Sequence, residues 1–244
     1  MTTPAGDPRT APPQVPGPQV PGPQVPGPQV HDRHPLALAL FALTAVSGLI
    51  DAVSYLGLGH VFTANMTGNV VVIAFALAGA PGFSVAGSLT SLVAFLAGAV
   101  LAGRLAGRYA TTRRGRWLRA ALVLEVSLHG AAAAVAFVRG VEGAAQYTVI
   151  ALVAVAMGIR NGTVRALAVP DLTTTVLTLT LTGLAADSRL AGGTAPRQRR
   201  RVLAVATMLA GALPGAVLVL HGQIAWALVA SAVLAGATVL LNRE

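Results

Sequence analysis

Cysteine and lysine are absent from the 244 residues of this chain, and all 17 basic residues are arginine. Without cysteine the protein has no disulfide, no thiol nucleophile and no cysteine-ligated metal. Charged residues make up only 10% of the chain against 55% apolar residues, which is too little charge for a soluble domain of this length. The chain also lacks a nucleophile elbow, a phosphate-binding loop, a dinucleotide fingerprint and an HExxH motif, so we expect no enzymatic activity, no cofactor and no metal site.

The net charge of +9 comes largely from arginines in two short loops between apolar segments. Loop 104–119 holds six arginines and no acid, and loop 187–201 holds five arginines against Asp187. This is the charge pattern of cytoplasmic loops in membrane proteins. We therefore expect the lipid bilayer as a partner and no binding of nucleic acid.

Residues 1–35 form a separate tail in which the unit QVPGP repeats from Gln14. Proline and glycine at this density form neither helix nor sheet, so the tail is predicted to be disordered, with polyproline character. It lacks the basic start and short apolar core of a signal peptide. A neutral spacer is favoured over a PxxP-type ligand.

From residue 36 to residue 241 the chain consists of apolar segments of the kind that form membrane helices. We count eight of them: 36–58, 62–80, 86–107, 118–138, 145–167, 173–187, 202–220 and 224–241. The sequence therefore predicts an all-α polytopic membrane domain over 36–241.

The membrane domain divides into two similar halves, about 36–138 and 145–241. Gly48-x-x-Asp51 is matched by Gly158-x-x-Asn161, and the polar string TANMTGN is matched by a threonine-rich run over 173–182. The string LAGA at 96–99 recurs at 209–212. Because these matches occur in the same order in both halves, they indicate an internal repeat.

The two arginine loops indicate how many segments cross the membrane. If both loops are cytoplasmic, an even number of crossings separates them, yet three apolar segments lie between them. One of the three therefore does not cross. Three crossings and one broken or re-entrant segment per half, in an inverted repeat, satisfy this constraint and place both termini in the cytoplasm. Eight full crossings are the alternative to these six.

The segments that open with polar residues are the re-entrant candidates. The apolar stretch 70–79 would form about 15 Å of helix, half of a hydrocarbon core of about 30 Å. Two such elements entering from opposite faces would meet near the midplane, where protein or water must satisfy their backbone. Polar side chains predicted there either line a path for a neutral or weakly charged solute or form hydrogen bonds between helices. They are Asn65, Thr67, Asn69, Thr175 and Thr178.

Ionisable side chains inside the predicted spans are candidates for function. Asp51 is predicted to bind a proton or a cation; a buried acid paired with an arginine or with backbone donors is the alternative. Glu125 and His129 are four residues apart on one helix face, where they either relay protons or lie near the headgroups. Asn161 occupies the position of Asp51 in the second half.

Arg160 next to Asn161 has two interpretations. It is either the counter-charge of Asp51 or an anion site, or it marks the cytoplasmic end of its helix together with Arg165, which we favour.

Three strings resemble the YoaK family of bacterial inner-membrane proteins, for which no activity is established: G-x-x-D-A at 48–52, F-x-x-N-M-T-G-N at 62–69 and A-M-G-x-x-N at 156–161. The resemblance covers about 36–241 and implies six transmembrane helices. Family members often have glutamine where this chain has Arg160, and Thr-Gly where it reads Thr178-Leu179. A charge at position 160 is therefore not an expected part of a shared mechanism.

The function predicted from these patterns is transport or channelling of a small solute, with proton or cation coupling at Asp51. A homo-oligomer is a further partner expectation. The alternative is a non-transporting membrane scaffold that binds partners through its tail and its arginine loops.

Overall fold

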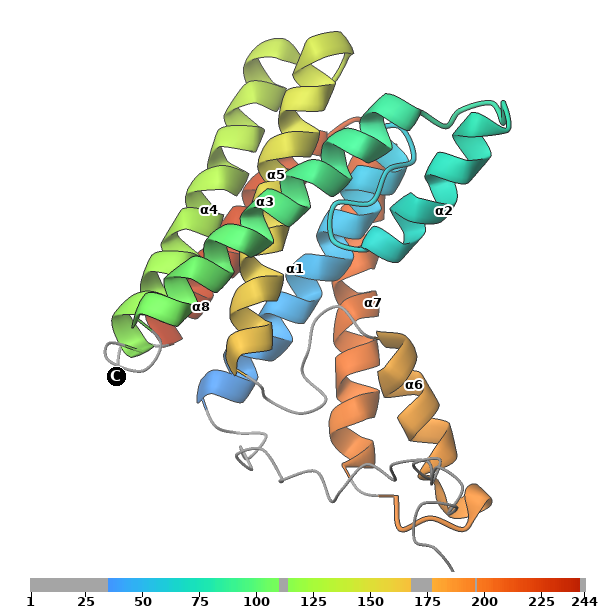
Figure 1. Cartoon of the computed structure of the whole chain (residues 1–244), viewed down its shortest axis with the longest axis vertical. Coiled ribbons are helices and arrows are strands. Elements are labelled where there is room, and N and C mark those ends of the chain that lie inside the picture. Colours follow the sequence, from blue (N-terminus) through green and yellow to red (C-terminus); the bar gives the residue numbers. More distant parts are fainter. Residues whose placement is uncertain (1–34, 110–113, 168–176, 196, 242–244) are drawn as a thin grey trace, which may run out of the picture.

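A computed structural model describes residues 35–109, 114–167, 177–195 and 197–241, which contain helices and no strand (Figure 1). The helices are α1 (Pro35–Gly57), α2 (Met66–Leu77), α3 (Val85–Tyr109), α4 (Arg114–Arg139), α5 (Gly143–Leu167), α6 (Leu177–Ala186), the 3-10 turn η2 (Arg189–Ala191), α7 (Gln198–Leu220) and α8 (Ile224–Leu241). The predicted all-α polytopic fold is confirmed. The predicted tail lies outside the described residues, apart from Pro35 at the start of α1.

Helix length separates the elements into spanning and shorter ones. Five helices are long and apolar enough to cross a membrane, namely α1, α3, α4, α5 and α7. The helices α2 and α6 have 12 and 10 residues. At about 1.5 Å per residue each covers only about half of a hydrocarbon core of about 30 Å. The helix α8, with 18 residues, is apolar but shorter than the five.

The first short helix begins earlier than hydropathy predicted. The predicted stretch was 70–79, whereas α2 begins at Met66, so Thr67 and Asn69 belong to its first turns. The non-helical connection is thus only 58–65. The difference arises because Asn69 bonds to the chain before the helix, a contact that a hydropathy pattern does not contain.

Each close contact made by a helix of the first half has a counterpart made by the equivalent helix of the second half. The contact of α1 with α7 corresponds to that of α5 with α3, and the contact of α1 with α8 corresponds to that of α5 with α4. In the same way, the contact of α2 with α3 corresponds to that of α6 with α7, and the contact of α3 with α4 corresponds to that of α7 with α8. The pair α4 and α8 is its own counterpart. Figure 1 shows that α1 and α5 run in opposite directions, as do α3 and α7. The apolar core lies mainly between α1, α4, α5 and α8.

Glycines allow the closest of these crossings. They are Gly48 and Gly211 between α1 and α7, and Gly98 and Gly158 between α3 and α5. A Cβ atom on Gly48 would collide with the carbonyl oxygen of Met208, and one on Gly158 would collide with that of Phe95. The helix backbones therefore touch, as in other small-residue contacts of membrane helices.

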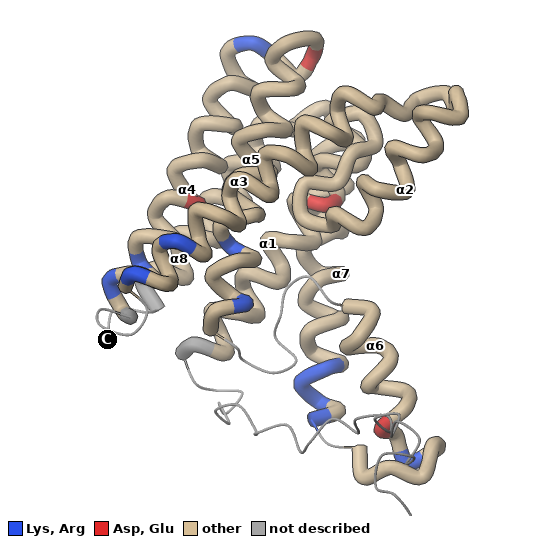
Figure 2. The backbone as a smooth tube through the Cα atoms, in the orientation of Figure 1, with Lys and Arg blue, Asp and Glu red and all other residues tan. Residues whose placement is uncertain are grey.

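Arginines mark one end of the molecule. Figure 2 shows basic residues gathered where α3 leads to α4 and where α6 leads to α7, with fewer at the opposite end. We call the former the arginine-rich end. The helix α1 begins and α8 ends toward this end (Figure 1).

Candidate functional site

The connection 58–65 is held by the side chain of Asn69. The backbone N–H of Phe62 donates to Asn69 Oδ1 over 2.8 Å, and Asn69 Nδ2 donates to the Phe62 carbonyl over 2.5 Å. The hydroxyl of Ser91 on α3 donates to the same carbonyl over 2.6 Å. Both backbone groups of Phe62 are thereby satisfied, as a non-helical backbone inside a membrane requires.

The ring of Phe62 explains the glycine of the same motif. A Cβ atom on Gly68 would lie 2.5 Å from Phe62 Cδ2, so only glycine leaves room for the ring there. On its other side the ring stacks on Tyr55, with 4.9 Å between ring centroids. The string F-x-x-N-M-T-G-N therefore specifies a connection between α1 and α2 that the hydrogen bonds of Asn69 to Phe62 hold in place. The amide of Asn69 serves this tie, and its predicted role in solute binding stays a prediction.

Asp51 faces the connection from α1. The backbone of Ala64 forms a hydrogen bond with its carboxyl group. Three buried side-chain oxygens have no hydrogen-bond partner among the described residues, namely Asp51 Oδ1, Thr63 Oγ1 and Ser88 Oγ. A carboxylate with an unsatisfied buried oxygen is costly in an apolar interior, which favours a bound proton or cation.

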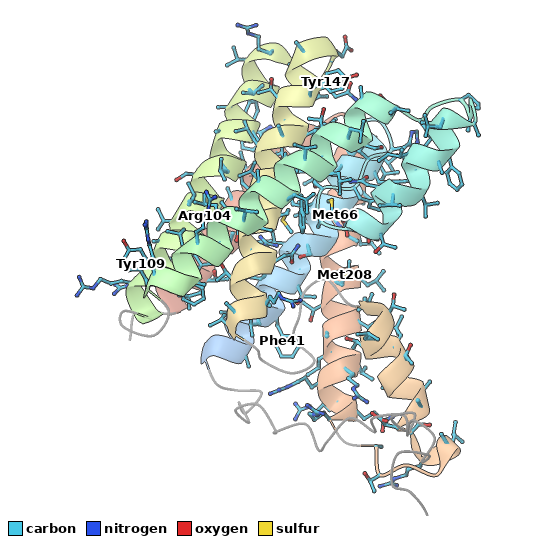
Figure 3. The ribbon with its side chains drawn as sticks, in the orientation of Figure 1. Phe41, Met66, Arg104, Tyr109, Tyr147 and Met208 are labelled. Carbon is cyan, nitrogen blue, oxygen red and sulfur yellow. The ribbon has the colours of Figure 1, made fainter. Side chains whose placement is uncertain are left out.

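The depth of this region follows from the side chains in Figure 3. Met66, the first residue of α2, lies between Tyr147 at one end of the molecule and Tyr109 at the arginine-rich end. The connection 58–65 and α2 thus meet between the two ends of the molecule.

A polar stripe runs along α1 through Asp51. Thr44, Ser47, Asp51 and Ser54 are spaced by three or four residues and so lie on one helix face. The hydroxyls of Thr44 and Ser47 donate back to the carbonyls of Leu40 and Leu43, over 2.8 Å and 3.1 Å. We call these four residues the α1 stripe. Sequence reasoning singled out only Asp51, although the spacing was visible.

Arg160 and Glu125 form a buried ion pair. Arg160 Nε donates to Glu125 Oε1 over 3.0 Å, and Nη2 donates to the same oxygen. Nη1 donates to the Leu43 carbonyl over 3.0 Å and to Ser47 Oγ over 3.2 Å. The side chains of Arg160 and Glu125 are 2% and 1% exposed. The favoured interpretation, that Arg160 marks the cytoplasmic end of its helix, did not include this buried ion pair with Glu125.

His129 lies one turn beyond Glu125 on α4 and is fully buried. Within the part of the chain that the structure describes, neither ring nitrogen has a hydrogen-bond partner. The predicted relay between Glu125 and His129 thus has both members in one buried region without a direct hydrogen bond between them.

The structure does not gather the remaining predicted residues into one site. Asn65 and Thr67 at the start of α2 are exposed, as is Thr178 on α6, and Asn161 on α5 is half-buried. Thr175 lies outside the described residues. Two polar groups result: one around Asp51 and the connection 58–65, and one around Arg160 and Glu125.

The helices, their apolar lengths and the charge distribution define a multi-pass helical membrane protein in contact with the lipid bilayer. Residues 39–241 match the family described as "Protein of unknown function (DUF1275)", and the chain belongs to that family.

One curated relative shares 36% identity over 150 residues, namely the "UPF0700 transmembrane protein YoaK" of Bacillus subtilis (strain 168). The match covers 62% of this chain and 65% of the relative, just under two thirds of its length. The resemblance expected from the motifs is confirmed. No solved structure matches the chain.

Proposed function

We propose that this protein is a small-solute transporter or channel of the bacterial cytoplasmic membrane, coupled to a proton or a cation at Asp51. The observation that carries the proposal is the buried Oδ1 atom of the half-buried Asp51, which lacks a hydrogen-bond partner among the described residues and belongs to a carboxyl group that faces the non-helical connection 58–65. Ionisable groups within a membrane span are rare unless they serve a pathway.

The arrangement of the helices supports the same proposal. In our reading α1, α3, α4, α5, α7 and α8 cross the membrane, while α2 and α6 are half-length elements on opposite sides. The paired contacts and opposed directions of the two halves support an inverted repeat, in which a site would lie beside broken helices at the repeat interface. The arginine-rich end then faces the cytoplasm, with both termini.

Ion flux through the full chain in proteoliposomes tests the proposal. An imposed proton or Na⁺ gradient is expected to give flux above that of empty liposomes, reported by an enclosed pH-sensitive or Na⁺-sensitive dye. Asp51→Asn keeps the size of the side chain and removes its charge, so flux is expected to disappear while the melting temperature is retained.

Asp187→Asn is the matched control, because the side chain of Asp187 is 45% exposed and the residue directly follows α6, where α6 leads to α7. It is expected to keep the flux. Equal flux from wild type and Asp51→Asn would contradict the proposal. A scaffold instead predicts no flux in any variant and a phenotype on deletion of residues 1–34.

A further inference from the structure

We infer that the Glu125–Arg160 ion pair is a gate that closes the route between Asp51 and the arginine-rich end. The inference rests on the proposed function, since it gives the Asp51 site its access route. It assigns to Arg160 a role that its sequence position does not suggest.

The pair joins three helices at the level of Leu43 and Ser47 on α1. Arg160 comes from α5, Glu125 from α4, and the carbonyl of Leu43 with the hydroxyl of Ser47 from α1. Among the described helices, α1 packs closely on α7 and α8, and α5 packs closely on α3 and α4. The side chain of Arg160, rather than close backbone packing, therefore connects α1 to α5.

The pair lies between Asp51 and the arginine-rich end. The helix α1 begins at that end, and Ser47 comes four residues before Asp51 on the α1 stripe, about one helical turn. Arg160 is held at Ser47 and is still near enough to interact electrostatically with Asp51. Any path along the stripe from the arginine-rich end to Asp51 must pass the guanidinium.

A pocket lies on the arginine-rich side of the pair. It has room for about one water molecule, and Glu125 and Arg160 form part of its lining. Leu122 and Leu167 line the pocket with Thr163, whose buried hydroxyl has no partner in the described part of the chain. The pocket thus approaches the Asp51 region from one side and ends at the ion pair.

An ion pair suits a gate better than an apolar plug. Two charges in an apolar interior are stabilised only by each other and by the hydrogen bonds around them, and the loss of their hydration offsets much of that attraction. If water enters from the pocket, both charges regain hydration, so the separated state is accessible. A released guanidinium one turn from Asp51 could then neutralise that carboxylate after its ion has left.

Thiol labelling tests the gate without requiring a known solute. The chain has no cysteine, so Thr63→Cys places a single thiol beyond the pair, in the connection that faces Asp51. Inside-out and right-side-out membrane vesicles are treated with a membrane-impermeant methanethiosulfonate. In the Thr63→Cys background, Glu125→Gln is expected to speed labelling in inside-out vesicles about tenfold, as a loss of about 1.4 kcal/mol from the closed state would give. The rate in right-side-out vesicles is expected to stay the same.

Two further variants keep the test decisive. Ser47→Ala removes one of the bonds to Arg160 and preserves the charge pair, so a smaller acceleration on the same side is expected even if Glu125→Gln folds poorly. Asp187→Asn breaks the ion pair with Arg201 at the arginine-rich end and is expected to leave the labelling rate unchanged.

An unchanged rate in both Glu125→Gln and Ser47→Ala, or an equal acceleration in both vesicle orientations, would overturn the gate. The result is separable from that of the flux assay. If labelling accelerates on one side only and no ion flux is found, the gate is supported and the proposed function is contradicted. If flux depends on Asp51 and the labelling rate does not change, the proposed function is supported and the gate is contradicted.

Discussion

At the crossing of α1 and α7, Gly48 lies against the carbonyl of Met208, and at the crossing of α3 and α5, Gly158 lies against the carbonyl of Phe95. The two crossings are built alike, but the polar residues beside them differ. Three residues after each glycine stands Asp51 in one half and Asn161 in the other. A crossing of this shape therefore forms with or without a charge at that position.

The residues two positions after the same glycines differ more strongly. Ile50 is 0% exposed and Arg160 is 2% exposed, so equivalent buried positions hold an alkyl side chain and a guanidinium. Burying a charge costs free energy that an alkyl group avoids. The comparison teaches that packing is common to the halves, while the charges are additions that stability does not require.

The largest expected effect concerns the glycine crossings, which are built alike in the two halves. Gly48→Val and Gly158→Val should each remove the folded protein, because a side chain at either crossing meets the backbone of the partner helix and costs about 3 kcal/mol or more. Fluorescence-detected size exclusion in mild detergent measures the folded fraction. Gly103→Val is the control on α3, where a Cβ atom has nothing within 4 Å. A normal elution profile for only one of the two crossing variants would show that the halves are packed differently.

The next effect concerns the charges that only one half possesses. Arg160→Met leaves Glu125 buried without its partner and should lower the free energy of unfolding by about 3–5 kcal/mol. Adding Glu125→Gln should recover part of this loss, because no unpaired charge is left. At the equivalent position Ile50→Val should cost only about 1 kcal/mol. Thermal unfolding of the purified variants measures all three, and strictly additive losses for the double variant would contradict a direct pair.

A smaller effect separates the two asparagines of the F-x-x-N-M-T-G-N motif. Asn69→Ala leaves the N–H of Phe62 without its acceptor, which should cost about 1–3 kcal/mol, while Ser91 still serves the carbonyl. Asn65→Ala should change stability by less than about 0.5 kcal/mol, since its exposed side chain makes no capping hydrogen bond. Melting temperatures compare the two, and equal losses would argue against the tie at Phe62.

The smallest effect belongs to the second ion pair. Arg201 Nη1 lies 2.7 Å from Asp187 Oδ2, and the aspartate is 45% exposed. Water already reaches nearly half of this side chain, so Asp187→Asn should cost less than about 1 kcal/mol. A loss as large as that of Arg160→Met would mean that exposure does not distinguish the two pairs.

Sequence patterns predicted the helical class and the short elements, because hydropathy and charge report directly on a membrane environment. The role of Asp51 stays a prediction. These patterns did not predict the partner of Arg160. Glu125 is 35 residues away, and its distance from Arg160 depends on how α4 and α5 are rotated against each other, which composition does not specify. The start of α2 was also placed too late, because the bonds of Asn69 to Phe62 are tertiary contacts.

The crossings of α1 with α7 and of α3 with α5 have a consequence for biogenesis. Each helix of these pairs has its closest partner in the opposite half, so we expect α1 to remain without that partner until α7 is synthesised. A chain divided in the turn between α4 and α5 should yield two fragments that are degraded when made alone and protected when made together.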